Sequence, residues 1–154
     1  MTELLIIYDG YCVFCESWVN LCLRNINNTE IKLVHLSDIK LKEKTYLEYS
    51  KYIKSDTIIV IDDNKIYFKS AAALKVFSRC NAPYNFLSKI LNLFPYSFLN
   101  IFYDLIGYIR YKIFGKKTSC EINNPIISKN LISSNQQIPQ NLFFNDYFEF
   151  NFKK

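Results

Sequence analysis

Two cysteines lie where an expected strand gives way to an expected helix, and this placement constrains the fold more than any other feature. Leu4–Tyr8 is a short apolar run without polar alternation, which predicts a buried strand. Asp9-Gly10 then interrupts the run with residues typical of a turn. Across Val13–Asn25 the apolar side chains follow helical spacing. Cys12 and Cys15 therefore stand at a strand-to-helix junction.

The first half of the chain continues with alternating strand and helix patterns. Ser37-Asp38 and Ser70 are typical N-cap residues and predict helix starts. The expected elements are strands over 31–36, 57–61 and 65–68, and helices over 39–52 and 71–79. A strand–helix–strand unit has a right-handed crossover and parallel strands, whereas the hairpin adds an antiparallel edge. The β-α-β-α-β-β-α order predicts an α/β protein with a thioredoxin-like core and additional C-terminal helices.

The sequence changes character after Pro83. Two further helices are expected over 86–94 and 95–114. Pro95 stands where a helix can start, and Gly115 stands where a helix can end. These helices are additions to the β-α-β-α-β-β-α order of the first half.

The segment past residue 120 is rich in Asn, Ser, Gln and Pro, which is typical of a loop. Residues 141–152 regain aromatic side chains and are expected to add a short strand. We therefore divide the chain into a core over 1–82, a C-terminal helical extension packed on the core over 83–120, and a loop or partly ordered tail over 121–154.

Composition and charge exclude several classes of protein. The chain has 154 residues, of which 50% are hydrophobic and 21% charged, as in a folded domain with its own core. Its 19 basic and 14 acidic side chains leave a net charge of +5, which is too mild to indicate binding to nucleic acid. The longest uncharged stretch, between Lys89 and Asp104, falls short of the roughly 20 residues that span a bilayer. With no signal-peptide pattern, a cytoplasmic location and no transmembrane segment are expected.

The cysteines favour redox chemistry over a structural disulfide framework. There are five of them, an odd number, and a cytosolic protein keeps most thiols reduced. Two cysteines three positions apart at a helix start lie within bonding reach of each other. The unpaired N–H groups and the positive end of the helix dipole favour the thiolate, which is the reactive form. The pattern predicts thiol-disulfide exchange without a bound cofactor.

The predicted chemistry gives each sulfur a role. Cys12, nearer the helix end and expected to be the more exposed, attacks a substrate disulfide and forms a mixed disulfide. Cys15 resolves it and leaves a Cys12–Cys15 disulfide. Asp9, three residues before Cys12, either accepts the proton from Cys15 or caps the turn that it forms with Gly10.

Two other interpretations of the cysteine pair stay open. The pair could be half of a zinc site, but zinc requires four ligands, and His35, Cys22, Cys80 and Cys120 do not show a matching spacing. No metal site is therefore predicted. The pair could also be inert core cysteines, as Cys22 and Cys80 are expected to be. His35 ends a strand and is expected to be a boundary residue with satisfied hydrogen bonds.

The segment Asp9-Gly10-x-Cys12-x-x-Cys15 resembles the signature of the DCC family of thiol-disulfide oxidoreductases, which are small thioredoxin-like proteins. The resemblance extends over about residues 4–120. Its further matches are Tyr67, Ser70-Ala71-Ala72-Ala73-Leu74, Pro95, Tyr103-Asp104, Arg110-Tyr111 and Phe114-Gly115. It implies an enzyme that exchanges its dithiol with a disulfide-bearing protein or a low-molecular-weight thiol, and an unidentified electron donor. It also makes Cys120 a possible additional redox thiol.

Substrate contacts are expected on the loop that carries the pair and on the strand beside it. Gly10 and Tyr11 precede the first cysteine, and Gly10 supplies a backbone shape that other residues resist. Thioredoxin-like enzymes usually carry a proline just before the third strand, but residues 55–57 contain none. Asp56 and Thr57 are therefore expected to hold the substrate backbone.

A different class of function also fits the sequence, namely a non-catalytic module that binds a protein or a membrane surface and has structural or metal-binding cysteines. The aromatic helices over Phe86–Phe114 would form its binding face. This alternative gains if their apolar side chains form an exposed, contiguous surface, and it loses if they pack on the sheet. The basic run Arg110, Lys112, Lys116 and Lys117 is interpreted as a solvated helix end, where cations suit the dipole.

Overall fold

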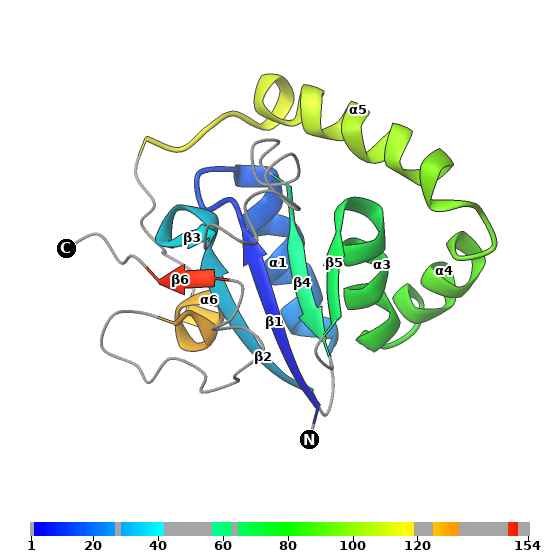
Figure 1. Ribbon diagram of the computed structural model, residues 1–154, viewed down its shortest axis with the longest axis horizontal. Coiled ribbons are helices and arrows are strands. Elements are labelled where there is room, and N and C mark those ends of the chain that lie inside the picture. Colours follow the sequence, from blue (N-terminus) through cyan, green and yellow to red (C-terminus); the bar gives the residue numbers. More distant parts are fainter. Residues whose placement is uncertain are drawn as a thin grey trace.

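A four-stranded mixed sheet forms the centre of the protein, with helices packed around it (Figure 1). The computed structural model describes residues 2–26, 29–41, 57–62, 65–118, 125–132 and 148–150. The strands of the sheet are β1 (Thr2–Tyr8), β2 (Thr29–His35), β4 (Ile59–Asp62) and β5 (Lys65–Phe68), in the order β2-β1-β4-β5. The helices are α1 (Val13–Asn25), α3 (Lys69–Arg79), α4 (Tyr84–Leu91), α5 (Tyr96–Phe114) and α6 (Pro125–Asn130).

The strand pairing follows the expected connections. β1 and β2 are parallel, with Leu4 opposite Ile31, as a strand–helix–strand unit requires. β4 pairs antiparallel with β1, and β5 pairs antiparallel with β4, with Asp62 opposite Lys65. The predicted parallel pair and hairpin are therefore confirmed. The architecture is mixed α/β and is consistent with a thioredoxin-like fold.

β1 is buried on both faces, which explains why its sequence lacks polar alternation. Its even-numbered residues from Leu4 to Tyr8 are at most 1% exposed and pack with Val19 of α1 and Val76 of α3. The side chains between them pack with Ile59 of β4 on the opposite face of the sheet. Each fully buried aliphatic side chain contributes about 1.5–3 kcal/mol. β1 thus anchors both halves of the core and fixes the position of the loop that follows it.

The ends of α1 and α5 lie where the sequence predicts them. Pro95 is the N-cap residue of α5, and its ring sets a backbone angle that a helix start accepts. Gly115 ends α5 with φ of 79°, a left-handed conformation that glycine adopts without strain. This turn redirects the chain toward the start of α1.

The prediction of a helix over 39–52 is wrong for its first three residues, which form a strand. A short 3₁₀ turn, Leu36–Asp38, is followed by β3 (Ile39–Leu41), which pairs antiparallel with β6 (Phe148–Phe150). The local pattern could not show this, because the partner strand lies more than 100 positions away. The strand expected within 141–152 is confirmed at β6. Residues 42–56 lie outside the described residues.

Two smaller expectations are also corrected. Residues 125–130, predicted as part of a loop or partly ordered tail, form α6, whose Ile127 is fully buried. A helix of six residues is too short to show a periodic pattern. Ser70 does not cap α3, since Phe68 is the N-cap residue there and no side chain caps it. Instead, the Ser70 hydroxyl donates a hydrogen bond to Asn100 of α5 at 2.6 Å.

α4 and α5 run along one edge of the molecule, with α5 passing above the end of α1 in the view of Figure 1. Their apolar side chains are largely exposed, including Phe86, Ile101 and Leu105 at 63, 65 and 55%. This exposure supports one part of the alternative function, namely that residues 86–114 form a face that binds a protein or a membrane surface. Within the described residues, none of the helices has the length and apolar character needed to cross a membrane.

Candidate active site

The structure joins Cys12 and Cys15 in a disulfide at the start of α1. Their Cα atoms lie 5.2 Å apart, within the range that a disulfide requires. Cys12 is the N-cap residue of α1, and its sulfur accepts a hydrogen bond from the backbone N–H of Cys15 at 3.2 Å. The sulfur thus takes the position of a capping oxygen and faces the positive end of the helix. This geometry suits a sulfur that alternates between thiolate and disulfide.

The loop before the pair is held by Asp9. One carboxylate oxygen of Asp9 accepts a hydrogen bond from the Tyr11 N–H at 3.0 Å, and the other accepts one from the Tyr111 hydroxyl of α5. The Asp9 carbonyl accepts a hydrogen bond from the Cys12 N–H at 3.3 Å. The predicted turn-capping role of Asp9 is therefore confirmed, and its carboxylate also joins the loop to α5.

The segment that follows α5 covers Cys12. The Lys117 N–H donates a hydrogen bond to the Tyr11 carbonyl at 2.9 Å, and Lys116 forms an isolated β-bridge with Cys12. As a result Cys12 is 0% exposed, whereas Cys15 is half-buried. The expectation that Cys12 is the more exposed cysteine is wrong. Its burial depends on a contact between segments far apart in the sequence.

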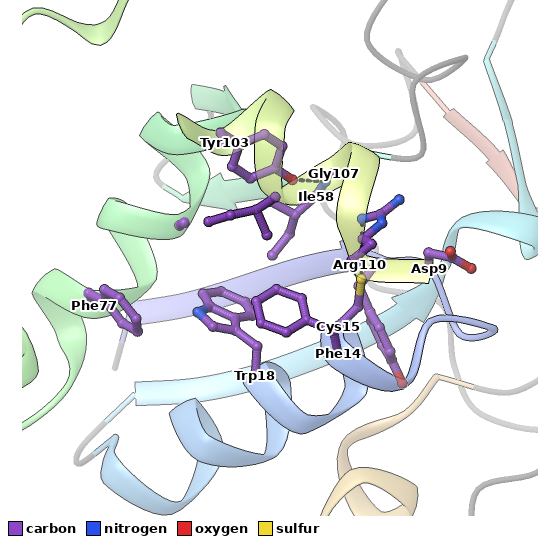
Figure 2. Close-up of a pocket in the computed structure, with 12 residues that line it drawn as sticks. Asp9, Phe14, Cys15, Trp18, Ile58, Phe77, Tyr103, Gly107 and Arg110 are labelled. Carbon is purple, nitrogen blue, oxygen red and sulfur yellow. Dashed lines mark hydrogen bonds between the residues drawn. The ribbon is translucent and has the colours of Figure 1, made fainter. Parts of the chain in front are cut away.

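A pocket of about 280 Å³ opens beside Cys15 (Figure 2). It lies between the first turns of α1 below, the inner face of α5 above and α3 to one side. Aromatic and aliphatic side chains make up most of its wall, and Cys15, Asp9 and Arg110 lie at one end. The main apolar lining residues are Phe14, Trp18, Ile58, Phe77, Tyr103 and Ile106. The pocket therefore offers an apolar surface next to the sulfur of Cys15.

Arg110 brings a positive charge to that sulfur. Its Nη1 donates a hydrogen bond to Cys15 Sγ at 3.3 Å, and the residue is only 5% exposed. The guanidinium also lies over the ring of Tyr111 and donates to its hydroxyl at 3.4 Å. A buried guanidinium beside a thiol stabilises the thiolate. The sequence pattern predicts that Arg110 is part of a solvated helix end. That prediction is wrong for Arg110, because its side chain is buried against Cys15.

Comparison with known proteins identifies the family. The family model described as DCC1-like thiol-disulfide oxidoreductase matches residues 6–116, which include the cysteine pair and Arg110. The chain belongs to this family.

Two relatives cover most of the DCC1-like chain. The uncharacterised protein YuxK of Bacillus subtilis is 28% identical over 131 residues, which are 83% of this chain and 93% of YuxK. A DCC family protein of Arabidopsis thaliana, named as chloroplastic, is 23% identical over 118 residues, which are 77% of this chain and 69% of that protein. No solved structure matches significantly.

Three of the predicted substrate-binding residues of this DCC1-like protein, Gly10, Tyr11 and Thr57, do not line the pocket. Gly10 is buried, and Tyr11 is half-buried in the loop that covers Cys12. Thr57 is 1% exposed, and its hydroxyl contacts the Tyr103 hydroxyl at 3.2 Å. Asp56 and Cys120 lie outside the described residues.

Two further cysteines of the DCC1-like protein belong to its core, as predicted. Cys22 and Cys80 are 1% and 4% exposed and pack in the cluster that includes β1. A hydrogen bond with the Cys80 thiol, together with burial, raises the pKa of Cys22 well above its usual range. His35 is buried, and its ring lies 5.1 Å from that of Tyr8. Among the described residues, no group of three or more His, Cys, Asp and Glu side chains could hold a metal ion.

Sequence reasoning missed the contribution of α5 to the site. Tyr103, Gly107 and Arg110 all line the pocket and are spaced three to four positions apart, which puts them on one helix face. This stripe of polar and small residues, within a helix that is otherwise rich in Phe, Leu and Ile, was a usable signal. The stripe predicts that α5 turns a polar face toward the protein. It does not predict that this face contacts Cys15.

Proposed function

We propose that this protein is a thiol-disulfide oxidoreductase that exchanges its Cys12–Cys15 pair with a disulfide-bearing protein or a low-molecular-weight thiol. One observation carries the proposal: Cys15 faces an apolar pocket while a buried guanidinium contacts its sulfur. Membership of the DCC1-like family supports the same chemistry. The cytoplasmic location stays a prediction.

We further propose that Cys15, rather than Cys12, makes the first attack. The Cys15 thiolate attacks one sulfur of the substrate disulfide, forms a mixed disulfide and expels the other substrate sulfur as a thiolate, which takes up a proton. Cys12 then loses its proton and attacks Cys15, which expels the second substrate thiol and forms the Cys12–Cys15 disulfide. The pair loses two electrons, and the substrate disulfide becomes two thiols. The reverse sequence oxidises a substrate dithiol.

The two sulfurs have environments suited to this order. Cys15 is accessible from the pocket and has Arg110 to stabilise its thiolate. Cys12 is covered by Lys116 and its neighbours, so a substrate disulfide reaches it only after that segment moves. Cys12 still lies within bonding reach of Cys15. It is therefore placed to resolve a mixed disulfide without itself meeting the substrate.

Asp9 is proposed as the proton acceptor for the Cys15 thiol before it attacks the substrate disulfide. It lines the same end of the pocket as Cys15 and Arg110. Its carboxylate is held there by Tyr11 and Tyr111, so it keeps its position when the disulfide opens.

Trapping with glutathione disulfide tests both parts of the proposal. Cys12→Ser and Cys15→Ser are prepared in a Cys120→Ser background, and the mixed disulfide is followed by mass spectrometry. Because Cys15 is the accessible sulfur, Cys12→Ser should accumulate glutathione on Cys15 at least tenfold faster than Cys15→Ser does on Cys12.

The outcomes separate the order of attack from the function. Faster trapping on Cys12 would contradict the Cys15-first order and leave the redox function in place. Absence of trapping in both variants, with no reversible disulfide in the wild-type protein, would contradict the redox function itself.

A second function is favoured by the exposed apolar side chains of α4 and α5. It concerns binding to a surface and can coexist with the redox chemistry, because all of these side chains except Ile106 lie outside the lining of the pocket.

A further inference from the structure

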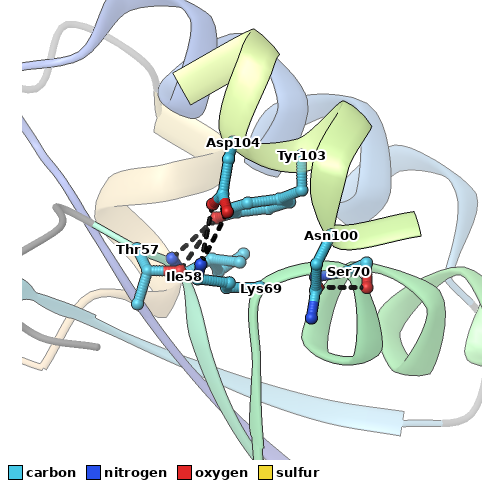
Figure 3. A network of polar contacts seen from close by, with 7 residues as sticks. All are labelled: Thr57, Ile58, Lys69, Ser70, Asn100, Tyr103 and Asp104. Atoms are coloured by element: carbon cyan, nitrogen blue, oxygen red, sulfur yellow. Dashed lines mark hydrogen bonds and ion pairs between the residues drawn. The ribbon is translucent and has the colours of Figure 1, made fainter. Parts of the chain in front are cut away.

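Helix α5 turns polar side chains toward the protein, as Figure 3 shows. Asn100 accepts hydrogen bonds from the backbone N–H and the hydroxyl of Ser70 at 3.3 and 2.6 Å. The Tyr103 hydroxyl accepts hydrogen bonds from the Ile58 N–H and the Thr57 hydroxyl at 3.0 and 3.2 Å. The inner face of this helix is therefore attached to the core mainly through polar contacts.

Charged residues continue the same inward face. Asp104 forms an ion pair with Lys69 at 2.8 Å, and Arg110 contacts Cys15. Arg110 is the one residue of α5 that is buried. A surface helix normally buries apolar side chains and exposes polar ones. α5 has the reverse arrangement.

The outer face of α5 is apolar and continuous. Ile101 and Leu105, four positions apart, are 65% and 55% exposed. The ring of Phe98 stacks with that of Phe94 at a centroid distance of 5.9 Å and meets that of Phe102 at 5.1 Å. These rings form a row along the helix surface.

α4 and its link to α5 extend the apolar surface. Phe86 and Leu93 are 63% and 83% exposed, whereas the buried residue of α4 is Ser88. Outside residues 86–114, Leu21 is the only large hydrophobic side chain among the described residues that is classed as exposed. We define the α4–α5 apolar face by six of its exposed side chains, namely Phe86, Leu93, Phe98, Ile101, Phe102 and Leu105.

The charge around this face is positive. Lys89 of α4 and Lys112 of α5 are exposed on the two helices that carry this face. Asp104, the one acidic residue within 83–118, is already paired with a lysine of α3. An apolar face with lysines at its edges is complementary to a surface of acyl chains and anionic headgroups.

We propose that the α4–α5 apolar face docks on the surface of an anionic lipid bilayer. The Phe, Leu and Ile side chains would enter the boundary between headgroups and acyl chains, while the lysines reach the phosphates. A second copy of the chain fits this face less well, because a two-fold interface would set two positively charged copies of this surface against each other, and its one carboxylate, Asp104, is already paired with Lys69. The proposal goes beyond the redox function and does not rest on it.

Docking through this face also has a consequence for the redox site. Ile106 is 42% exposed and lines the pocket beside Cys15. A protein docked through α5 therefore holds the edge of its pocket close to the membrane surface.

Co-sedimentation of the full chain with lipid vesicles tests the proposal. The wild-type protein should sediment with vesicles of equal parts phosphatidylcholine and phosphatidylglycerol, and much less with pure phosphatidylcholine vesicles. High salt should weaken the binding, because it screens the lysines. Lys89→Ala and Lys112→Ala should each lower the partition coefficient about fivefold.

A matched pair of acidic substitutions locates the contact. Ile101→Glu combined with Leu105→Glu should abolish sedimentation, whereas Leu21→Glu, at an exposed position of α1 outside this face, should leave it intact. All positions are exposed, and circular dichroism verifies that each variant folds. The glutathione exchange rate in solution should be the same in these variants as in the wild type.

Three results would overturn the proposal. The first is a wild-type protein that stays in the supernatant with anionic vesicles, and the second is equal loss of binding in the Leu21→Glu control. The third is a dimer in analytical ultracentrifugation that Ile101→Glu with Leu105→Glu dissociates, because the occupant of the face is then a second copy.

Discussion

The guanidinium of Arg110 donates a hydrogen bond to the sulfur of Cys15 at 3.3 Å, although 95 positions separate the two residues in the chain. The contact joins the last turns of α5 to the first turn of α1. It makes α5 part of the candidate active site rather than an appendage. It also gives Cys15 a stabilising charge that Cys12 lacks among its described contacts.

Replacing Arg110 should slow the reaction of Cys15. A hydrogen bond to a charged group contributes about 1.5–3 kcal/mol, so Arg110→Gln should lower the rate of Cys15 alkylation at pH 7 by roughly tenfold or more. The measurement is the rate of iodoacetamide modification of the reduced protein, resolved by peptide mass spectrometry. Arg110→Lys keeps the charge and should recover part of the rate. Equal rates in Arg110→Gln and wild type would show that the guanidinium does not act on this sulfur.

Removing the hydroxyl of Tyr103 should loosen α5. Tyr103→Phe leaves the Ile58 N–H and the Thr57 hydroxyl without the oxygen that now contacts both. The expected loss in the free energy of unfolding is about 1–3 kcal/mol, measured by urea denaturation. Tyr108→Phe, a change of the same type at an exposed position of α5, serves as the control and should cost far less. A similar loss in both variants would contradict the anchoring role of Tyr103.

Gly107 allows the pocket to be filled without disturbing the helix. A Cβ at this position meets no atom within 4 Å, so Gly107→Ala should stabilise α5 by about 0.5–1 kcal/mol in thermal unfolding. Gly107→Leu should place its side chain in the pocket and slow trapping of glutathione on Cys15 by roughly tenfold. An unchanged trapping rate in Gly107→Leu would mean that substrates approach Cys15 by another route.

Asp62 should make the protein sensitive to acid. Its side chain is 1% exposed and lies 2.9 Å from Lys75 and 2.6 Å from Arg79. Burial opposes ionisation, but the two cations outweigh it and hold the pKa of Asp62 below its ordinary value of 3.8. Because the folded pKa is the lower one, the stabilisation is complete above about pH 4 and is lost as the pH falls further.

Asp62→Asn tests this assignment. The variant should lose about 1.5–3 kcal/mol at pH 7, and its stability should depend less on pH below pH 4 than that of the wild type. Urea denaturation at a series of pH values gives both quantities. Parallel pH profiles for the two proteins would contradict the role of Asp62.

The sequence predicted the local features of the fold well. β1 and α1 lie where apolar runs and helical spacing indicated, and Gly115 ends α5 as expected. Features that depend on distant partners were missed. The pairing of Ile39–Leu41 with Phe148–Phe150 is one case, because the two strands lie more than 100 positions apart in the chain.

In the candidate active site, too, local features could be predicted and features that depend on distant residues could not. Cys12, Cys15 and the turn at Asp9 could be predicted because spacing and turn chemistry are local. The burial of Cys12 could not, since it depends on Lys116 crossing back over the loop. The polar stripe on α5 was visible in the sequence, but high aromatic content throughout the chain concealed which face is turned outward.

A redox titration of the purified protein tests the central claim most directly. The protein is equilibrated in dithiothreitol buffers of defined potential and alkylated, and each cysteine is then assigned by mass spectrometry. The account predicts one reversible two-electron transition that forms the Cys12–Cys15 disulfide, at a potential between about −270 and −120 mV. Cys22 and Cys80 should stay protected throughout, because both are buried. A Cys12–Cys15 pair that never forms a reversible disulfide, or that is held by a metal ion, would contradict the account.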